Sequence, residues 1–238
     1  MNLEAIIATV ENPSGRMFGI EIECINITPA QANAALNAAG VACYNENYNH
    51  QRRNHWKVVT DGSLTGSGAG RAAEVVSPPL PFNVESLNQV SVVMNALKAA
   101  GARVDHSCGM HVHVDSRDMA SDMPDFSRIL FLKYRECEEM IDRLVASSRR
   151  SNSGSYCRSM KNLQRTSNWT NLRYERYQKL NFQSFERHGT VEFRQHEGCL
   201  TDTKAVAWII FCVTFYEQCR TYFREHRLTE VMTVAQWA

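Results

Sequence analysis

The spacing of hydrophobic and polar residues along the chain predicts interspersed strands and helices. Period-two alternation and short apolar runs predict strands at residues 17–27, 41–48, 56–60, 73–77, 110–115, 179–185 and 190–195. Apolar residues at helical spacing predict helices at residues 29–39, 83–100, 126–148 and 203–226. Because strands come first, helices lie between them and a hairpin comes late, we expect an α+β fold. Its sheet should be mainly antiparallel and curved, with about six strands and with helices packed on one face.

Two of the predicted helices carry apolar stripes that we expect to face the core. In residues 83–100 the stripe is Leu87, Val90, Met94 and Leu97. In residues 126–148 it is Ile129, Leu130, Lys133, Cys137, Met140, Ile141 and Leu144. The last helix is apolar nearly all round between residues 205 and 216, which predicts burial on more than one side. Residues 179–195 are predicted to form a hairpin with its turn at 187–189, where Gly189 can take a positive φ.

Composition and charge narrow the class of protein. Hydrophobic residues make up 44% of the 238, and 26 Lys and Arg nearly balance 25 Asp and Glu, for a net charge of +1. These values predict a folded single domain over residues 1–238 and exclude a disordered chain or a nucleic-acid coat. The longest apolar run, residues 205–213, is too short to cross a membrane, and the amino terminus lacks the pattern of a signal peptide. We therefore expect a cytoplasmic protein without a membrane partner.

Eight cysteines stand singly along the chain, and none forms a C-x-x-C pair. In a chain of this size, single cysteines are typically small buried hydrophobic residues, so a structural zinc site built from them is not expected.

Glutamates are placed two apart on the first predicted strand. Glu21 and Glu23 project from one face, and Ile20 and Ile22 project from the other. Taken alone, the pattern fits a half-solvated strand. The apolar residues on either side instead indicate an interior strand, where paired carboxylates require cations. Glu74, at the start of another apolar strand, is a weaker signal by itself.

Histidines and carboxylates share a face on two later strands. His111, His113 and Asp115 project together beside Gly109, which favours a binding site, although the H-x-H pattern also occurs in zinc hydrolases. On the second strand, Glu192, Arg194 and His196 are predicted to share a face. Alone, the Glu and Arg pair could be a surface ion pair that contributes little to stability.

An antiparallel sheet would gather these side chains on one concave surface. The predicted ligand set is then Glu21, Glu23, Glu74, His111 and Glu192. Oxygen-rich sets of this kind favour Mg²⁺ or Mn²⁺ over catalytic zinc, and magnesium held by carboxylates usually serves nucleotide phosphates. Arg194 and His113 would supply hydrogen-bond donors to those phosphates.

Residues 147–178 form a polar, basic segment that we expect to be a loop or lid inserted in the domain. Between residues 149 and 179, which include the lysine directly after the segment, the one acidic residue is Glu175. The basic residues there are Arg149, Arg150, Arg158, Lys161, Arg165, Arg173, Arg176 and Lys179. A solvated loop is the simplest interpretation. Because the segment precedes the strand that carries Glu192, we expect a wall that binds ATP phosphates or an anionic substrate. Tyr and Trp residues lie among these cations and could stack on a base, so a nucleotide or DNA base remains an alternative partner.

The ordered set of motifs resembles the carboxylate-amine ligase superfamily of glutamine synthetase and glutamate-cysteine ligase, and most closely its smaller amidoligase branch. The motifs occupy residues 19–23, 61–64, 74–78, 108–113, 180–182 and 190–194. They occur in the family's order over about residues 17–215 of the chain. The resemblance implies the curved sheet of a glutamine synthetase catalytic domain. It also implies an ATP-dependent ligase that joins an amino acid or peptide carboxylate to an amine through an acyl phosphate.

The resemblance also implies residue roles. Glu21, His111 and Glu192 would hold the metal that bridges the ATP phosphates, and Glu23 and Glu74 would hold a metal nearer the acyl acceptor. His113 would contact the transferring phosphate, and Arg194 would neutralise the substrate carboxylate or the acyl phosphate. We therefore predict Arg194, His113 and Glu192 as catalytic. His113, Arg194, Arg176 and Lys179 are predicted to bind ATP.

The chain departs from the larger enzymes in two ways. It lacks the separate amino-terminal domain of glutamine synthetase, so no ring assembly is carried over and the oligomeric state stays open. It also has no clear second glutamate beside Glu74, for which Asp115 or Asp61 is the candidate substitute. Two other classes remain open: a zinc-dependent hydrolase that uses the H-x-H strand, and a nucleic-acid-binding or modifying protein that uses the basic loop.

Overall fold

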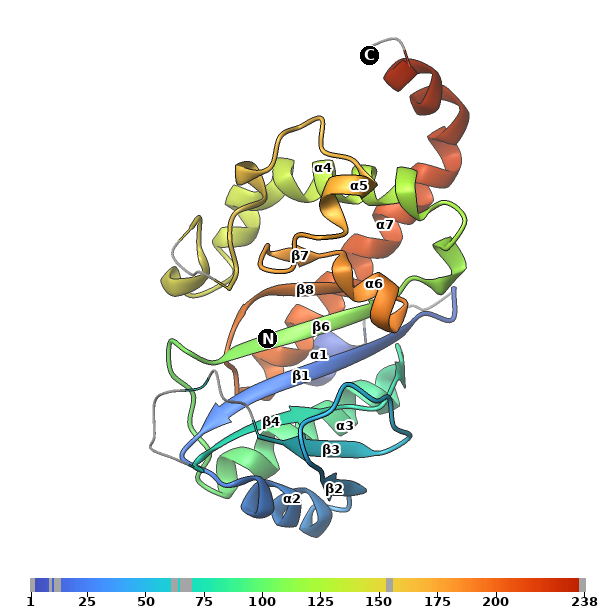
Figure 1. The fold of residues 1–238 in the computed structure, drawn as a ribbon. Helices are drawn as coiled ribbons and strands as arrows, with labels where there is room; N and C mark the ends of the chain where they lie inside the picture. Colours follow the sequence, from blue (N-terminus) through green and yellow to red (C-terminus); the bar gives the residue numbers. More distant parts are fainter. Residues whose placement is uncertain are drawn as a thin grey trace.

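One mixed sheet organises the fold (Figure 1). The computed structural model describes residues 3–8, 10, 14–60, 64, 70–152 and 156–235, with side chains through His226. Its strands are β1 (Met17–Ile25), β2 (Cys43–Asn45), β3 (Trp56–Val59), β4 (Ala72–Val76), β5 (Leu80–Pro81), β6 (Gly109–Asp115), β7 (Leu180–Asn181) and β8 (Thr190–Glu197). In the described chain the order is β2-β3-β4-β1-β6-β8-β7, with β5 paired to β1. All pairs are antiparallel except β2 with β3, which confirms the α+β class and the mainly antiparallel sheet.

Helices pack mainly on one face of this sheet, and one short helix lies on the other, so the prediction of helices on one face is only partly correct (Figure 1). They are α1 (Leu3–Ile7), α2 (Pro29–Ala38), α3 (Val84–Ala99), α4 (Met123–Asp142), α5 (Trp169–Leu172), α6 (Gln183–His188) and α7 (Asp202–Ala235). In Figure 1, α3 and α7 lie behind the sheet, while α6 lies on its front side beside β8. The opposite face of β1 and β6 is therefore left for polar chemistry.

The hydrophobic core lies between the sheet and the helices behind it. Ile20 and Ile22 of β1 and Val112 of β6 are fully buried there. The predicted stripe of α3 is confirmed, since all four of its residues are fully buried. Helix α7 packs against α1, α3, α4 and β6, which confirms its burial on more than one side. Side chains cap the entry of α2 and of α3: Thr28 Oγ1 accepts from the Gln31 amide at 3.2 Å, and Asn83 Oδ1 from Ser86 at 2.9 Å.

Helix α4 begins and ends earlier than predicted. It ends at Asp142, where the carboxylate accepts the Ser151 amide at 2.8 Å. The predicted stripe is only partly correct, because Leu130 and Ile141 are buried, whereas Met140 inside the helix is 68% exposed and Leu144 beyond it is 54% exposed. The face of α4 that is turned to the core instead carries Phe126, Leu130, Phe131, Tyr134 and Ile141.

The predicted hairpin at 179–195 is only partly correct. Strand β7 contains two residues and pairs with β8 as expected, but residues 183–188 form α6 instead of continuing the strand. Asn181 Oδ1 accepts the Gln183 amide at 2.9 Å, so a side chain starts the turn into the helix. Gly189 has the expected positive φ, 69°, and a Cβ there would lie 2.6 Å from Arg117 Cγ.

Strand β8 contains a β-bulge, which makes the predicted shared face of Glu192, Arg194 and His196 wrong. Val112 pairs with Phe193, but Met110 pairs with His196, so β8 contains an extra residue between these pairs. Beyond the bulge, alternation is reversed, and His196 does not share a face with Glu192 and Arg194. Its buried ring instead packs on Trp208 of α7, with ring centroids 5.2 Å apart.

A buried polar network holds the bulge against α4. Gln195 is fully buried; its Oε1 accepts the Tyr134 hydroxyl, and its Nε2 donates to Asp142 Oδ1 at 2.5 Å. Lys179, also fully buried, donates to Glu138 Oε1 at 2.6 Å and to the same Asp142 oxygen at 2.5 Å. Burial raises the pKa of Tyr134 well above its ordinary value, which keeps the hydroxyl a donor.

Two further sequence expectations concern cysteines and membrane spans. All eight cysteines lie in the described chain as free thiols, and all but Cys137 are buried, as predicted. No helix among the described residues is long and apolar enough to cross a membrane.

The buried ion pair predicts a large loss of stability for Lys179→Met. Removing the ammonium leaves Glu138, which is 2% exposed, as an uncompensated buried charge, at a cost of about 3–5 kcal/mol. Urea denaturation of the variant measures this loss. The double substitution Lys179→Met with Glu138→Leu should recover part of it, because the buried Glu138 charge is then gone, while Asp142, which is 13% exposed, still lacks its cation.

A matched exposed pair on the same helix serves as the control. Lys161 pairs with Glu139 at 2.5 Å on the surface, so Lys161→Met should cost less than about 1 kcal/mol. Equal losses for the two lysine variants would contradict a special role for the buried pair.

Candidate metal and substrate site

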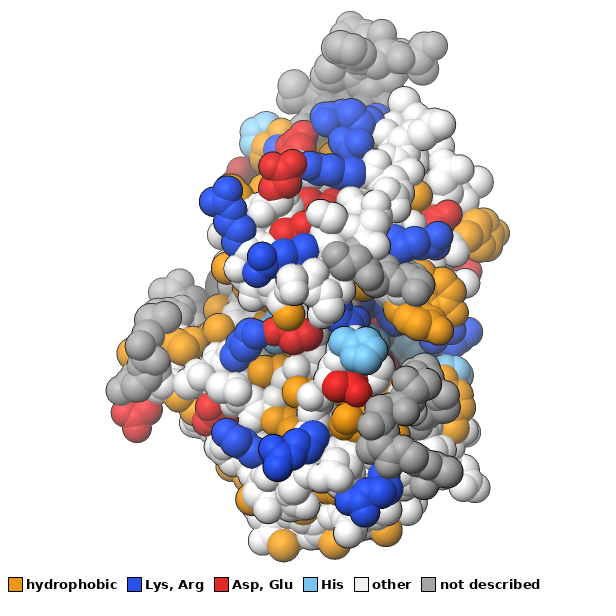
Figure 2. All heavy atoms as spheres, turned by 90° about the vertical axis from the view of Figure 1, so that its left-hand side faces the viewer, with side chains coloured by type: hydrophobic (Ala, Val, Ile, Leu, Met, Phe, Trp, Pro, Cys, Tyr) orange, Lys and Arg blue, Asp and Glu red, His pale blue; other side chains and the backbone are white. Residues whose placement is uncertain are grey.

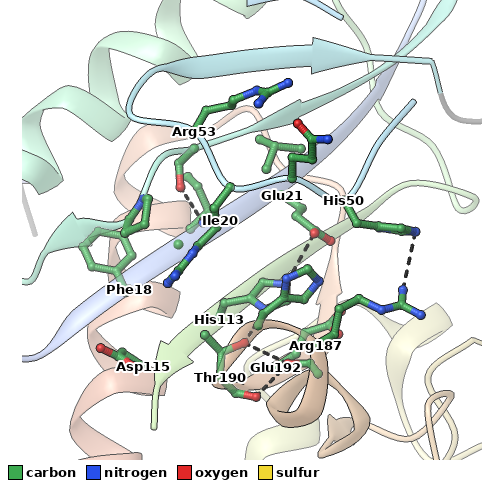
Figure 3. A pocket seen from close by; sticks show the side chains of 18 of the residues that line it. Phe18, Ile20, Glu21, His50, Arg53, His113, Asp115, Arg187, Thr190 and Glu192 are labelled. Atoms are coloured by element: carbon green, nitrogen blue, oxygen red, sulfur yellow. Dashed lines mark hydrogen bonds and ion pairs between the residues drawn. The ribbon is translucent and has the colours of Figure 1, made fainter. Parts of the chain in front are cut away.

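Three neighbouring strands bring acidic and imidazole side chains together on the front face of the sheet. Glu21 of β1 pairs in register with His111 of β6, and His113 of β6 pairs in register with Glu192 of β8. Side chains directly opposite each other in an antiparallel sheet are close neighbours. Figure 3 shows Glu21, His113 and Glu192 pointing toward one another at the floor of a cavity.

Glu21, His113 and Glu192 form a trio that could share one metal ion. Each offers a ligand atom, and these atoms all lie within 4.8 Å of one another. His113 Nε2 is buried and makes no hydrogen bond within the described chain, although it lies 3.4 Å from Glu21 Oε1. A buried ring nitrogen that faces two carboxylates is suited to a cation that bridges them.

A hydrogen-bonded side chain positions the other ring nitrogen of His113. Its Nδ1 lies 3.0 Å from Thr190 Oγ1. Ser184 Oγ donates to the Thr190 carbonyl at 2.7 Å, so the same Oγ can accept the Thr190 hydroxyl at 2.8 Å. The Thr190 oxygen is then left to accept from Nδ1. This chain of hydrogen bonds favours the tautomer in which Nε2 has a free lone pair.

His111 lies among three carboxylates rather than in the trio. Its Nδ1 is 3.1 Å from Glu21 Oε2 and 3.4 Å from Glu192 Oε1, and its Nε2 is 3.9 Å from Glu23 Oε1. Gly109 makes this approach possible, since a Cβ there would lie 2.9 Å from His111 Nε2. The Gly109 amide also donates to Glu23 Oε2 at 2.5 Å. The geometry therefore brings His113 together with Glu21 and Glu192 as one candidate ligand group, and it places the predicted ligand His111 beside the same two carboxylates.

Opposite charges keep the buried carboxylates ionised. Burial acts to raise the pKa of Glu21, but His113 and His111 hold it well below its ordinary value. Burial likewise acts to raise the pKa of Glu192, and Arg194, His113 and His111 hold it low. For His113, burial acts to lower the pKa, yet Glu21 and Glu192 raise it. The floor is thus a compensated cluster of charges that a metal ion could enter by displacing a proton.

Arg194 completes the floor. Its guanidinium contacts the Glu192 carboxylate, and its Nε donates to the Tyr156 carbonyl at 3.3 Å. Burial acts to lower the pKa of Arg194, but Glu192 and Glu21 raise it. On the other side of Glu192, Asn181 Nδ2 donates to Oε2 at 2.5 Å. Glu192 is therefore held from both sides, with Arg194 facing the cavity.

The remaining predicted ligands lie around this floor. Glu74 pairs in register with Glu23 and lines the same cavity, outside the trio. Asp115 lies near the cavity end and pairs with Arg117 at 2.7 Å. Asp61, with the rest of the motif up to Ser63, lies outside the described residues.

The cationic residues that were predicted to bind ATP lie in two different places. Arg194 and Arg176 line the cavity. Lys179 does not, because its ammonium is buried between Glu138 and Asp142 on the side of α4. Lys179 therefore holds the fold together and is not brought to the site.

The basic segment is a packed wall in its described residues, 147–152 and 156–178. It contains two short 3₁₀ turns and α5, and many of its cations have acidic partners. The pairs are Lys161 with Glu139, Arg165 with Glu136, Arg173 with Glu186 and Arg158 with Glu175. Figure 2 shows Lys and Arg side chains intermixed with Asp and Glu over the upper part of one face, rather than gathered in one basic patch. Among the described cations of the segment, Arg176 is the one that lines the cavity.

A second wall, residues 46–57, was missed by the sequence analysis. It lines the cavity with His50, Arg52, Arg53, His55 and Lys57. The signal was present as a cluster of basic and imidazole side chains within residues 50–57, but it has neither strand nor helix periodicity.

Two buried or half-buried groups give this second wall its shape. Glu46 accepts from Arg53 Nη2 at 2.9 Å and lies 3.1 Å from His55 Nε2. Lys57 Nζ donates to the carbonyls of Asn49 at 3.0 Å and of Gln51 at 2.9 Å. The loop between β2 and β3 is therefore fixed by its own side chains.

The cavity lies between the second wall and α6. His50 Nε2 and Arg187 Nη1 approach to 3.4 Å across it, as Figure 3 shows. The open space is about 1230 Å³ when the solvent-open mouth is included.

Glu46 predicts a pH dependence of stability. Hydrogen bonding to Arg53 lowers the pKa of Glu46 to about 2, below the value of about 4.3 in an unfolded chain. Its contribution to folding is therefore present above about pH 4.3 and is lost as the pH falls toward 2. Glu46→Gln should be less stable than the parent protein at pH 7 in urea denaturation, and the difference should shrink at pH 3. A deficit for Glu46→Gln that stays constant between pH 7 and pH 3 would contradict the assignment.

Comparison with known proteins places this arrangement in a family. A family model described as "Putative amidoligase enzyme" matches residues 14–173 and 163–216, which include β1, β6 and β8 and therefore the whole cavity floor. No curated protein matches the chain. Because the matched residues cover most of its length, the chain belongs to this amidoligase family.

Proposed function

We propose that the protein is an ATP-dependent carboxylate-amine ligase that forms an amide bond through an acyl phosphate. Membership of the amidoligase family supports carboxylate and amine substrates. The observation that carries the proposal is the trio Glu21, His113 and Glu192, with an unbonded buried Nε2 beside Arg194 at the floor of a large cavity.

The donor set fits a divalent metal ion. Two carboxylates and one imidazole supply mostly oxygen, which suits Mg²⁺ or Mn²⁺, and the imidazole is better accepted by Mn²⁺. Catalytic zinc usually has more nitrogen or sulfur ligands. The zinc alternative required His111, His113 and Asp115 together, but among the described residues these do not form a ligand group, and Asp115 pairs with Arg117.

The reaction needs activation of the carboxylate, because a carboxylate is a poor electrophile. Phosphorylation of its oxygen creates a leaving group, and attack of the amine nitrogen on the carbonyl carbon then releases phosphate and leaves the amide. A bound metal ion supplies charge neutralisation to the transferring phosphoryl group. In the proposed site Glu21, His113 and Glu192 hold that ion.

Arg194 would act on the acyl group. Its planar guanidinium can pair two oxygens of the carboxylate or the acyl phosphate, and Glu192 fixes its orientation. His111 would act indirectly by holding Glu21 and Glu23 in place. The two cavity walls would exclude water, which otherwise hydrolyses an acyl phosphate before the amine reacts.

Glu192→Gln tests the metal site. The neutral amide keeps the shape of the side chain but removes a charged ligand, so Mn²⁺ affinity measured by calorimetry should fall by about 100-fold or more. Release of ADP that depends on both acid and amine should be lost, while the circular dichroism spectrum is retained. Glu175→Gln, which removes a charge from the basic segment, should change neither. Unchanged Mn²⁺ binding by Glu192→Gln would exclude the proposed ligand set.

Thr190→Val tests the support of His113. The substitution removes the oxygen that bonds Nδ1 at 3.0 Å while nearly preserving volume. Loss of such an outer partner typically weakens metal binding about 10–100-fold. Mn²⁺ titration of Thr190→Val should give a value in this range, between the parent protein and Glu192→Gln. Thr170→Val in α5 is the matched control, and an effect of equal size there would point to general loosening of the fold.

A further inference from the structure

Three arginines at the cavity have no acidic partner among the residues that the structure describes. Arg52, Arg176 and Arg187 all line the cavity and are exposed. Within the described chain none of them makes an ion pair; Arg176 lies over the Tyr177 ring, and Arg187 contacts His50. We call these three residues the arginine mouth.

The other cavity cations are already satisfied. Arg53 pairs with Glu46, Arg117 with Asp115 and Arg194 with Glu192. Lys57, buried in the second wall, donates to backbone carbonyls and to Asn49. The positive charge of the arginine mouth is therefore an excess that the described residues of the cavity do not compensate.

The arginine mouth is built from three separate parts of the chain. Arg52 comes from the second wall, Arg176 from the end of the basic segment and Arg187 from α6. Folding brings like charges to one cavity, which costs free energy unless an anion occupies the space between them.

One histidine lies in this positive field. Burial lowers the pKa of His50, and Arg187 and Arg176 lower it further. The imidazole of His50 is then neutral at pH 7, so it adds hydrogen-bonding capacity without adding repulsion among the cations.

The arginine mouth is adjacent to the metal trio but separate from it. The ring centroids of His113 and His188 are 6.0 Å apart, and those of His188 and His50 are 6.3 Å apart. Arg187 contacts the last of these rings, as Figure 3 shows. A substrate that reaches from the trio to the mouth therefore needs a second anionic group on an extended molecule.

We propose that the arginine mouth is a second anion subsite, which takes a phosphate or carboxylate group that the trio does not bind. The group comes either from the polyphosphate of a nucleotide or from the non-reacting carboxylate of a diacid substrate. A ligase of the proposed kind holds two anionic substrates at once, and the excess cations offset their mutual repulsion. The identity of these substrates rests on the proposed function, whereas anion binding at the mouth does not.

The test uses metal-free protein and simple probes. Inorganic tripolyphosphate represents the nucleotide phosphates, and glutarate represents a diacid; each is titrated calorimetrically in EDTA at low ionic strength. Because a hydrogen bond to a charged group contributes about 1.5–3 kcal/mol, Arg187→Gln should weaken the binding of at least one probe by about tenfold or more. Arg52→Gln should weaken the same probe. Both side chains are exposed, so the variants should fold.

The pattern of loss identifies the source of the anion. Loss for tripolyphosphate alone supports the nucleotide phosphates, loss for glutarate alone supports a diacid, and loss for both supports a shared subsite. Arg143→Gln removes an exposed cation that does not line the cavity and should change neither. The proposal is overturned if the parent protein binds neither probe, if both mouth variants bind as the parent does, or if Arg143→Gln causes an equal loss. A protein without ligase activity would still give this readout, since neither metal nor turnover is involved.

Discussion

Buried negative charge is the constraint on which the rest of this structure depends. Glu21, Glu23 and Glu192 lie close together on one sheet face, where Glu23 and Glu192 are buried and Glu21 is half-buried, so water screens their charges poorly. Each is compensated by a neighbour on an adjoining strand or on its own strand, chiefly His111, His113 and Arg194. The strand register therefore has to be correct to the residue, because a slip of one position would turn every one of these side chains to the apolar face.

The part of the site that follows strict alternation was predictable from sequence. Period two alone predicts that Glu21, His113 and Glu192 project away from the core, whatever the partner strands are. The choice between His111 and His113 was not predictable, because both project from the same face. It depends on which ring lies beside which carboxylate and on the Thr190 hydroxyl, which sequence spacing does not report.

Some features were not predicted, because they depend on side-chain contacts that the spacing of residues along the chain does not report. Lys179 was assigned to the basic segment, since the acids that neutralise it lie on α4, 41 and 37 residues earlier in the chain. The second wall has no periodicity, and its shape is set by Glu46 and Lys57 acting on nearby backbone. Residues 183–185 alternate like a strand, yet a side-chain bond from Asn181 turns them into α6.

The bulge in β8 divides one strand into two functional halves. Before it, Glu192 and Arg194 face the cavity; after it, His196 packs in the core against Trp208. Gln195, between the two halves, bonds to Tyr134 and Asp142 of α4, so the residue next to Arg194 is fixed by that helix. The family model spans this strand. A relative that lacked the extra residue would carry the opposite alternation beyond this point, so the residue count of β8 is itself a criterion for deciding which sequences turn the position of His196 into the core.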